Sequence, residues 1–85
     1  MTDLESTPLL SQIRTSFIDG VSGPDLQSLL DKLMERRVLS DAEREAAEER
    51  SRRDKARFVI DTVRRKGEAD SSEMIRFLSE HLGLM

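Results

Sequence analysis

The chain has 85 residues, which allows one small domain with a modest core, and 36% of these residues are charged. Its 17 acidic and 14 basic residues leave a net charge of −3, which argues against a nucleic-acid-binding domain because such domains usually carry a net positive face. The absence of cysteine and the presence of a single histidine, His81, exclude disulfides and most zinc or nucleophile–base sites.

The chain is predicted to be all-α, because it contains no β-type alternation of useful length and no proline after Pro24. Residues 1–6 are expected to form a flexible lead-in, and residues 7–84 a single helical bundle. A first helix is predicted to begin with Thr7 as its N-cap, followed by Pro8, and to end at Asp19-Gly20.

A second helix is predicted from Pro24 to about Arg36. Its apolar residues recur at the spacing of one helical face, and they are Leu26, Leu29, Leu30 and Leu33. The next two apolar residues, Val38 and Leu39, are expected to be buried anchors in a short connector.

The third helix is predicted to start at Ser40, since Ser40 and Glu43 have the spacing of a capping box, and to continue to about Glu49. Its apolar residues are all alanines, namely Ala42, Ala46 and Ala47. A helix with such small apolar side chains has little to bury. We therefore expect it to be thin, to lie at the surface and to be mobile.

A fourth helix is predicted to start between Ser51 and Asp54 and to end at Gly67. Its apolar stripe has the spacing i, i+3, i+4, i+7, and its members are Ala56, Val59, Ile60 and Val63. A fifth helix is expected to begin between Asp70 and Ser72, with Glu73 able to complete its cap and residues 83–85 as a tail. Its wide apolar face consists of Met74, Ile75, Phe77, Leu78 and Leu82. The short connections favour antiparallel neighbours.

No arrangement of residues suggests catalysis, a cofactor or a metal. Carboxylates occur in pairs, such as Asp41 with Glu45, but these pairs are interpreted as a solvated face rather than a pocket that shifts their pKa values. His81 is interpreted as a charge near a helix C-terminus. No apolar run is long enough to cross a membrane and no signal-peptide pattern is present, so the expected location is the cytoplasm.

The two signs of charge are segregated along the chain. Acidic residues dominate from Asp25 to Glu49, and basic residues dominate from Arg50 to Lys66. If these segments lie on opposite sides of a bundle, copies of the molecule can stack head to tail, with charge complementarity setting register and association rate. The alternative is that the charges pair within one molecule as i,i+4 bridges. The basic cluster of residues 50–57 lacks aromatic interleaving, which weakens the case for nucleic-acid binding.

Several short segments carry a family resemblance. They are Phe17-Ile18, Leu29-Leu30-Asp31-Lys32-Leu33, Arg37-Val38-Leu39-Ser40, Asp54-Lys55-Ala56-Arg57, Ile60-Asp61-Thr62-Val63, Lys66-Gly67 and Leu82-Gly83-Leu84. In this order and spacing, over about residues 8–84, the chain resembles a caspase recruitment domain of the death-fold superfamily. It is most similar to the prodomain of inflammatory caspases or to a stand-alone relative of that prodomain.

The resemblance implies an antiparallel Greek-key bundle of five to six helices and no enzymatic activity of the domain itself. It implies self-association and binding to other caspase recruitment domains in a caspase, an adaptor or a sensor, with recruitment or oligomerisation of inflammasome components by filament assembly. It also implies a two-sided contact. The basic side matches Arg14, Arg52, Arg53, Lys55 and Arg57, and the acidic side matches Asp25, Asp31, Asp41 and Glu43.

Two departures from the family pattern affect these expectations. The chain is shorter before Leu82-Gly83-Leu84, so a sixth helix is expected to be short or absent. Thr15 stands where another basic residue is expected, which thins the basic side on the first helix. Two alternative functions stay open: a decoy that blocks such assemblies, and a helical nucleic-acid-binding domain.

Overall fold

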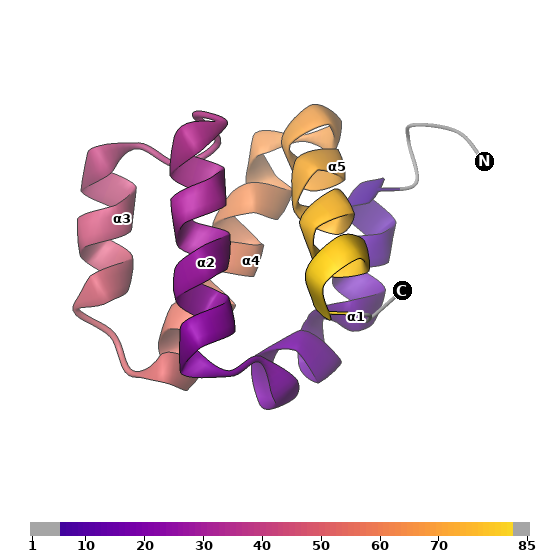
Figure 1. Cartoon of the computed structure of the whole chain (residues 1–85). Coiled ribbons are helices and arrows are strands. Elements are labelled where there is room, and N and C mark those ends of the chain that lie inside the picture. The colour runs from indigo at the N-terminus through magenta and orange to yellow at the C-terminus, as the bar shows by residue number, and fades with distance from the viewer. Residues whose placement is uncertain (1–5, 83–85) are drawn as a thin grey trace.

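The computed structural model of the protein describes residues 6–82, and Figure 1 shows their arrangement. Five α-helices follow one another, and a π-helical segment of 5 residues, η2, extends the last of them. Their bounds are α1 Ser6–Gly20, α2 Gly23–Glu35, α3 Asp41–Glu48, α4 Arg52–Lys66, α5 Glu68–Phe77 and η2 Leu78–Leu82. The prediction of an all-α bundle is confirmed, since residues 6–82 contain no strand.

Serine side chains cap three of the helices. Ser22, Ser40 and Ser51 each accept a hydrogen bond at Oγ from the backbone N–H three residues further on. At Ser40 the predicted capping box is complete, because the Ser40 backbone N–H donates to Glu43 Oε1 at 2.9 Å. These local interactions begin α3 and α4 where the sequence predicts them, and they begin α2 at Gly23, one residue before the predicted Pro24.

The predicted start of the first helix is wrong by two residues, since Thr7 as N-cap makes Pro8 the first helical residue. α1 includes Ser6, so Thr7 lies inside the helix rather than at its N-cap. Of the expected lead-in at residues 1–6, only Ser6 is among the described residues. The predicted end of this helix at Asp19-Gly20 is confirmed, since α1 stops at Gly20.

The predicted start of the fifth helix is also wrong. α5 begins at Glu68, directly after Gly67, and no side chain caps it. Gly67 has a φ of 115°, which glycine adopts easily, so it ends α4 and starts α5 within a single residue. Glu73, predicted as a cap, lies inside α5, and its Oε2 is 3.7 Å from Nε of Arg36.

All of these elements contribute to one hydrophobic core. The apolar stripes predicted for α2 and α4 are buried in it, and so are Val38 and Leu39, which confirms their expected role as anchors. α3 contributes only Ala47. The prediction that α3 is thin and lies at the surface is therefore confirmed, while its mobility stays a prediction.

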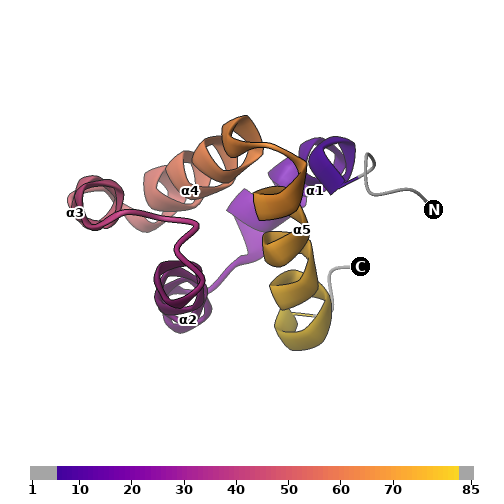
Figure 2. The same ribbon diagram turned by 90° about the horizontal axis from the view of Figure 1, so that it is seen from above.

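The helices are not equally central. α1, α4 and α5 pack against one another most extensively. Seen from above, α3 lies at one edge of the bundle, beside α2 and α4 and far from α1 (Figure 2). This arrangement leaves one side of α3 and one side of α4 facing outward.

The end of the described chain has no separate sixth helix. η2 continues directly from α5 at Leu78, and the tail expected at residues 83–85 lies outside the described residues. Within residues 6–82, no helix combines the length and the apolar character that a membrane span requires.

Candidate protein-interaction surfaces

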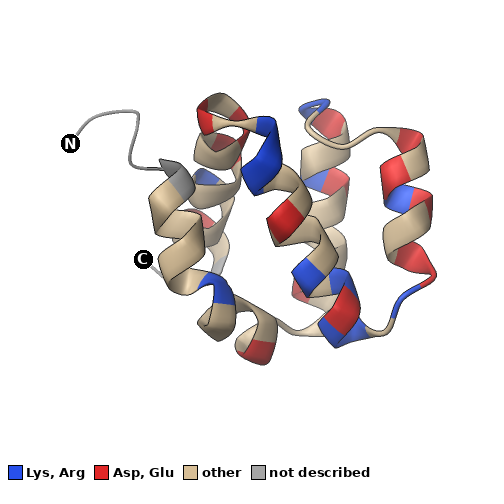
Figure 3. Ribbon diagram, turned by 180° about the vertical axis from the view of Figure 1, so that it is seen from behind, with Lys and Arg blue, Asp and Glu red and all other residues tan. Residues whose placement is uncertain are grey.

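The basic helix α4 and the acidic helix α2 lie on opposite sides of the molecule. α2 faces the viewer in Figure 1, and α4 faces the viewer in the opposite view, where Lys and Arg alternate with Asp along it (Figure 3). The expected separation of the two signs therefore holds for α2 and α4. It does not hold for α3, which packs directly against α4.

Arg14, the predicted basic residue of the first helix, is bound to α4. Its Nε and Nη2 donate to the two carboxylate oxygens of Asp61 at 2.8 and 2.9 Å, a bidentate pairing. These hydrogen bonds hold the pKa of the Asp61 carboxyl below its usual range, although burial acts in the opposite direction. Arg14 therefore joins α1 to α4 before any partner arrives.

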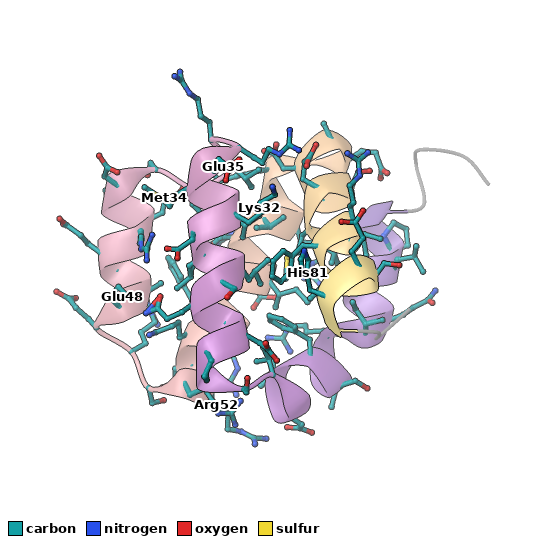
Figure 4. All side chains as sticks on the ribbon, viewed as in Figure 1. Lys32, Met34, Glu35, Glu48, Arg52 and His81 are labelled. Carbon is teal, nitrogen blue, oxygen red and sulfur yellow. The ribbon has the colours of Figure 1, made fainter. Side chains whose placement is uncertain are left out.

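Arg52 and Arg53 hold the C-terminal end of α1. Nη1 of Arg52 donates to the backbone carbonyls of Ile18 at 3.2 Å and Val21 at 2.6 Å. The last carbonyls of a helix have no partner inside the helix and carry partial negative charge, so a guanidinium stabilises them. Nη2 of Arg53 donates to Asp19 Oδ1 at 2.6 Å. Figure 4 labels Arg52 at the lower end of the bundle, where α1 ends.

Lys55 does not point outward from α4, contrary to its expected place on a partner-binding face. Its side chain is only 17% exposed, and its Nζ lies 3.2 Å from Glu48 Oε1 on α3. A second pair joins the same helices, since Nζ of Lys66 is 2.8 Å from Glu43 Oε1. Burial acts to raise the pKa of Glu43, but hydrogen bonds from Lys66 and from the Ser40 backbone outweigh it and lower that pKa.

Three of the residues predicted to bind a partner are exposed and have few interactions within the molecule. Arg57 is 53% exposed, and its only ion pair among the described residues is a long contact of 3.5 Å with Asp54 on the same helix. Asp25 and Asp41 lie in the first turns of α2 and α3, exposed, with no ion pair among the described residues. Asp31 differs, because Arg44 Nη2 lies 2.7 Å from its Oδ1, although the side chain is 67% exposed.

Internal pairing of charges, which the sequence left open as an alternative, does occur. Among the described residues, nine ion pairs form, of which three are i,i+3 contacts within a helix and six join different helices or the turns beside them. The pairs therefore differ from the expected i,i+4 bridges. They tie the bundle together and remove several cations from the set available to a partner.

Sequence reasoning missed an aromatic residue on the outer side of α4. The guanidinium of Arg50 lies over the ring of Phe58, 4.5 Å from its centroid. A hollow of about 230 Å³ surrounds this pair, and its lining residues are Arg50, Asp54, Arg57, Phe58, Asp61 and Arg65. The basic cluster of residues 50–57 contains no aromatic residue in its sequence, but the fold places Phe58 beneath one of its members, Arg50. The signal was present, since Phe58 falls off the apolar stripe of its own helix.

The outer side of α3 is its acidic counterpart. Asp41, Glu45 and Glu49 repeat every four residues, so they form one stripe. Together with Arg44 and Glu48 they line an open hollow of about 540 Å³. The carboxylates that line this hollow are all exposed, which fits the solvated-face interpretation.

His81, labelled in Figure 4, lies in η2. Its ring stacks on that of Phe77, with the centroids 4.5 Å apart. It is exposed and lies next to Glu80 in a hollow between α2 and α5. The structure thus gives His81 a packing contact near the end of the last helical segment among the described residues.

Comparison with known proteins gives a consistent result. The chain matches the family described as Caspase recruitment domain over residues 8–82. It is 36% identical over 74 residues to Caspase-1-A of Xenopus laevis and 33% identical over 87 residues to Caspase-1-B of the same organism. The matches cover 85% and 92% of the chain but only 19% and 23% of those proteins. No solved structure matches the chain.

Proposed function

The chain belongs to the caspase recruitment domain family, whose members are non-catalytic modules for homotypic binding, and on that premise we propose that it recruits or oligomerises inflammatory caspase signalling components in the cytoplasm. Its partners are other caspase recruitment domains, including copies of itself. Both curated relatives are named as caspases, and the chain spans about a fifth of their length. Protease activity is therefore a property of those longer proteins.

The observation that carries the proposal is an excess of cations on the outer side of α1 and α4. Three aspartates on this side each pair with an arginine of the same side, as Asp19 does with Arg53. The arginines on this side outnumber these aspartates. They are Arg14, Arg50, Arg53, Arg57, Arg64 and Arg65. We name this set the basic face.

The opposite charge gathers on α2 and α3. Asp25, Asp41, Glu45 and Glu49 form no ion pair among the described residues. We name these four residues, with Asp31, the acidic face. A contact between the basic face of one domain and the acidic face of the next joins two different surfaces, so it leaves one of each free at the ends of a dimer. Such a contact propagates into an open chain when its rotation does not close a ring.

Complementary charge explains how this contact selects its partner. Opposite potentials speed encounter and penalise partners with like charge, while they add less to raw affinity. The internal ion pairs support the same role, because they hold both faces in a defined shape. We expect assembly to weaken as salt concentration rises, since both faces are exposed to solvent.

The experiment is charge reversal on each face. Arg57→Glu and Asp31→Arg are introduced separately, and self-assembly is followed by light scattering, with circular dichroism to verify the fold. Each variant is expected to lose assembly while it keeps its helicity. If both variants assemble like the unmodified chain at low salt, the electrostatic contact between the two faces is wrong.

Seeding separates a recruiter from a decoy. The chain is added in small amounts to a recruitment domain from the Xenopus laevis relative Caspase-1-A. A recruiter accelerates polymerisation of that domain, whereas a decoy slows it. Acceleration supports the proposal, and inhibition replaces it with the decoy function.

A further inference from the structure

Phe58 lies outside the buried apolar stripe of α4. It follows Ala56 by two residues, which places it about 200° around the helix from that buried residue. Charged residues share this outward stripe at positions 54, 61 and 65. Phe58 contacts the core at one side, yet it is only partly buried.

The guanidinium of Arg50 lies over one face of the Phe58 ring. Arg50 belongs to the turn between α3 and α4, and its guanidinium forms no ion pair among the described residues. A cation–π contact at an exposed site is among the weaker interactions of a protein surface. A carboxylate of a partner can therefore pair with Arg50 in place of this cation–π contact, which exposes the Phe58 ring.

We propose that Phe58 is the apolar anchor of the basic face and that its occupant is the outer side of α3 from a second copy of this chain. This inference rests on the proposed function, because it specifies which residues carry the homotypic contact. Arg50, Arg57 and Arg65 surround the anchor and receive the carboxylates of Asp41, Glu45 and Glu49.

Three features of α3 fit it to this hollow. Its outward acidic stripe has no internal ion pair among the described residues, so its charge is available. The side chain beside the stripe is Ala42, which is exposed and small enough to let the helix approach the ring closely. α3 also lies at the edge of the bundle, where a neighbouring molecule can reach it without meeting α1 (Figure 2).

The hollow is poorly suited to nucleic acid. Asp54 and Asp61 line it together with the three arginines, so its net charge is small. A continuous run of phosphates needs a row of cations without interruption. A helix that carries separated carboxylates and a small apolar side chain fits this mixed lining better.

The first test separates apolar from electrostatic contributions. Self-association of the full chain is measured by sedimentation at low and high salt for Phe58→Ala, Arg50→Gln and Arg65→Glu, with Arg76→Gln as control. Arg76 is a suitable control because it is exposed on α5 and forms no ion pair among the described residues. We expect Phe58→Ala to weaken association at least about tenfold at both salt concentrations, as loss of a central aromatic does.

The charge variants are expected to behave differently. Arg65→Glu weakens association most at low salt and reduces its salt dependence, while Arg50→Gln weakens association and Arg76→Gln leaves it unchanged. If Phe58→Ala loses helicity, Arg50→Gln and Arg65→Glu decide the result, since neither residue belongs to the core. If both of these associate like the unmodified chain while Arg57→Glu does not, the anchor is wrong and the proposed function stands. If Arg57→Glu also has no effect, both fail.

The second test identifies the occupant. Arg65→Glu and Glu45→Arg each weaken one face, so at a concentration where the unmodified chain assembles each variant alone is expected to stay largely monomeric. A mixture of the two joins the intact faces into dimers in any head-to-tail arrangement. It grows beyond dimers only if positions 65 and 45 meet and the reversed charges attract each other. Growth beyond dimers supports α3 as the occupant, and a mixture that stops at dimers overturns it.

Discussion

Arg14 on α1 and Asp61 on α4 form two parallel hydrogen bonds of 2.8 and 2.9 Å, although 47 positions separate them in the sequence. The residue that the family resemblance assigns to a partner is thus already engaged inside the molecule. The pair fixes the two helices that carry the basic face. The pair therefore keeps the two helices, and the surface they carry, in a fixed position. A partner can contact only the part of Arg14 that stays exposed.

The pair makes stability depend on pH in a defined direction. The pKa of Asp61 is lower in the folded state than in the unfolded chain, so its contribution is complete above the unfolded pKa of about 4 and is lost as pH falls through the folded pKa. Urea unfolding of the unmodified chain and of Asp61→Asn across acidic pH measures this. The difference between their unfolding free energies is expected to be about 1–2 kcal/mol at neutral pH and to shrink on acidification. The pKa of Glu43 is also lowered, but Glu43 is present in both proteins, so its effect cancels in the comparison. If the stabilities of the two proteins change with pH in the same way, the assignment to Asp61 is wrong.

Removing the Arg52 side chain is expected to destabilise the bundle. Arg52→Ala leaves the carbonyls of Ile18 and Val21 without their donor, and we expect a loss of about 1–2 kcal/mol in urea unfolding. Arg57→Ala is the matched control on the same helix, with an expected change within about 0.5 kcal/mol. Equal stabilities of the two variants would show that Arg52 has no structural role.

The hydroxyl of Thr62 is buried on α4, and Oγ1 has no hydrogen-bond partner among the described residues. Thr62→Val replaces this hydroxyl by a methyl group of similar size. Because an unsatisfied buried polar group costs free energy, the variant is expected to be more stable by about 0.5–1 kcal/mol in thermal unfolding. A lower melting temperature would indicate that Oγ1 is satisfied in solution.

Substitution of Gly67 is expected to destabilise the bundle because of its backbone conformation alone. Its φ of 115° and ψ of −170° suit glycine, and no atom lies within 4 Å of the place that a Cβ would occupy. Gly67→Ala is therefore expected to cost about 1–3 kcal/mol in unfolding free energy without any clash. Gly20→Ala provides the comparison, because Gly20 is also in open space but has an ordinary φ. A similar small effect at both positions would refute the strain argument.

Amide hydrogen exchange tests the predicted mobility of α3. Only Ala47 of this helix is buried, whereas α4 buries a complete stripe, so α3 has less packing to oppose local opening. The amides of α3 are expected to exchange faster than those of α4. Equal protection of the two helices would show that the ion pairs of Lys55 and Lys66 with α3 are enough to hold it in place.

Local patterns predicted most of the helices, and the failures have local causes. Ser40 with Glu43 located the start of α3 correctly because a capping box is made within one turn. The start of α5 was predicted too late because a glycine at positive φ lets two helices follow without a loop, and the sequence does not reveal φ. The apolar spacing of α4 likewise identified its buried face, since helical periodicity alone decides which residues share a side.

The sequence by itself determined the helical class, the family and the segregation of charge along the chain, because caps, stripes and motifs depend on neighbours within a few residues. Only the tertiary structure decided which charges are free. Arg14, Arg52 and Lys55 meet their partners across helix contacts, and such contacts depend on how the helices pack. The same packing left Phe58 at the surface under Arg50. Of the residues first predicted for the basic side, Arg57 stays in the candidate contact, and Arg50 and Arg65 join it.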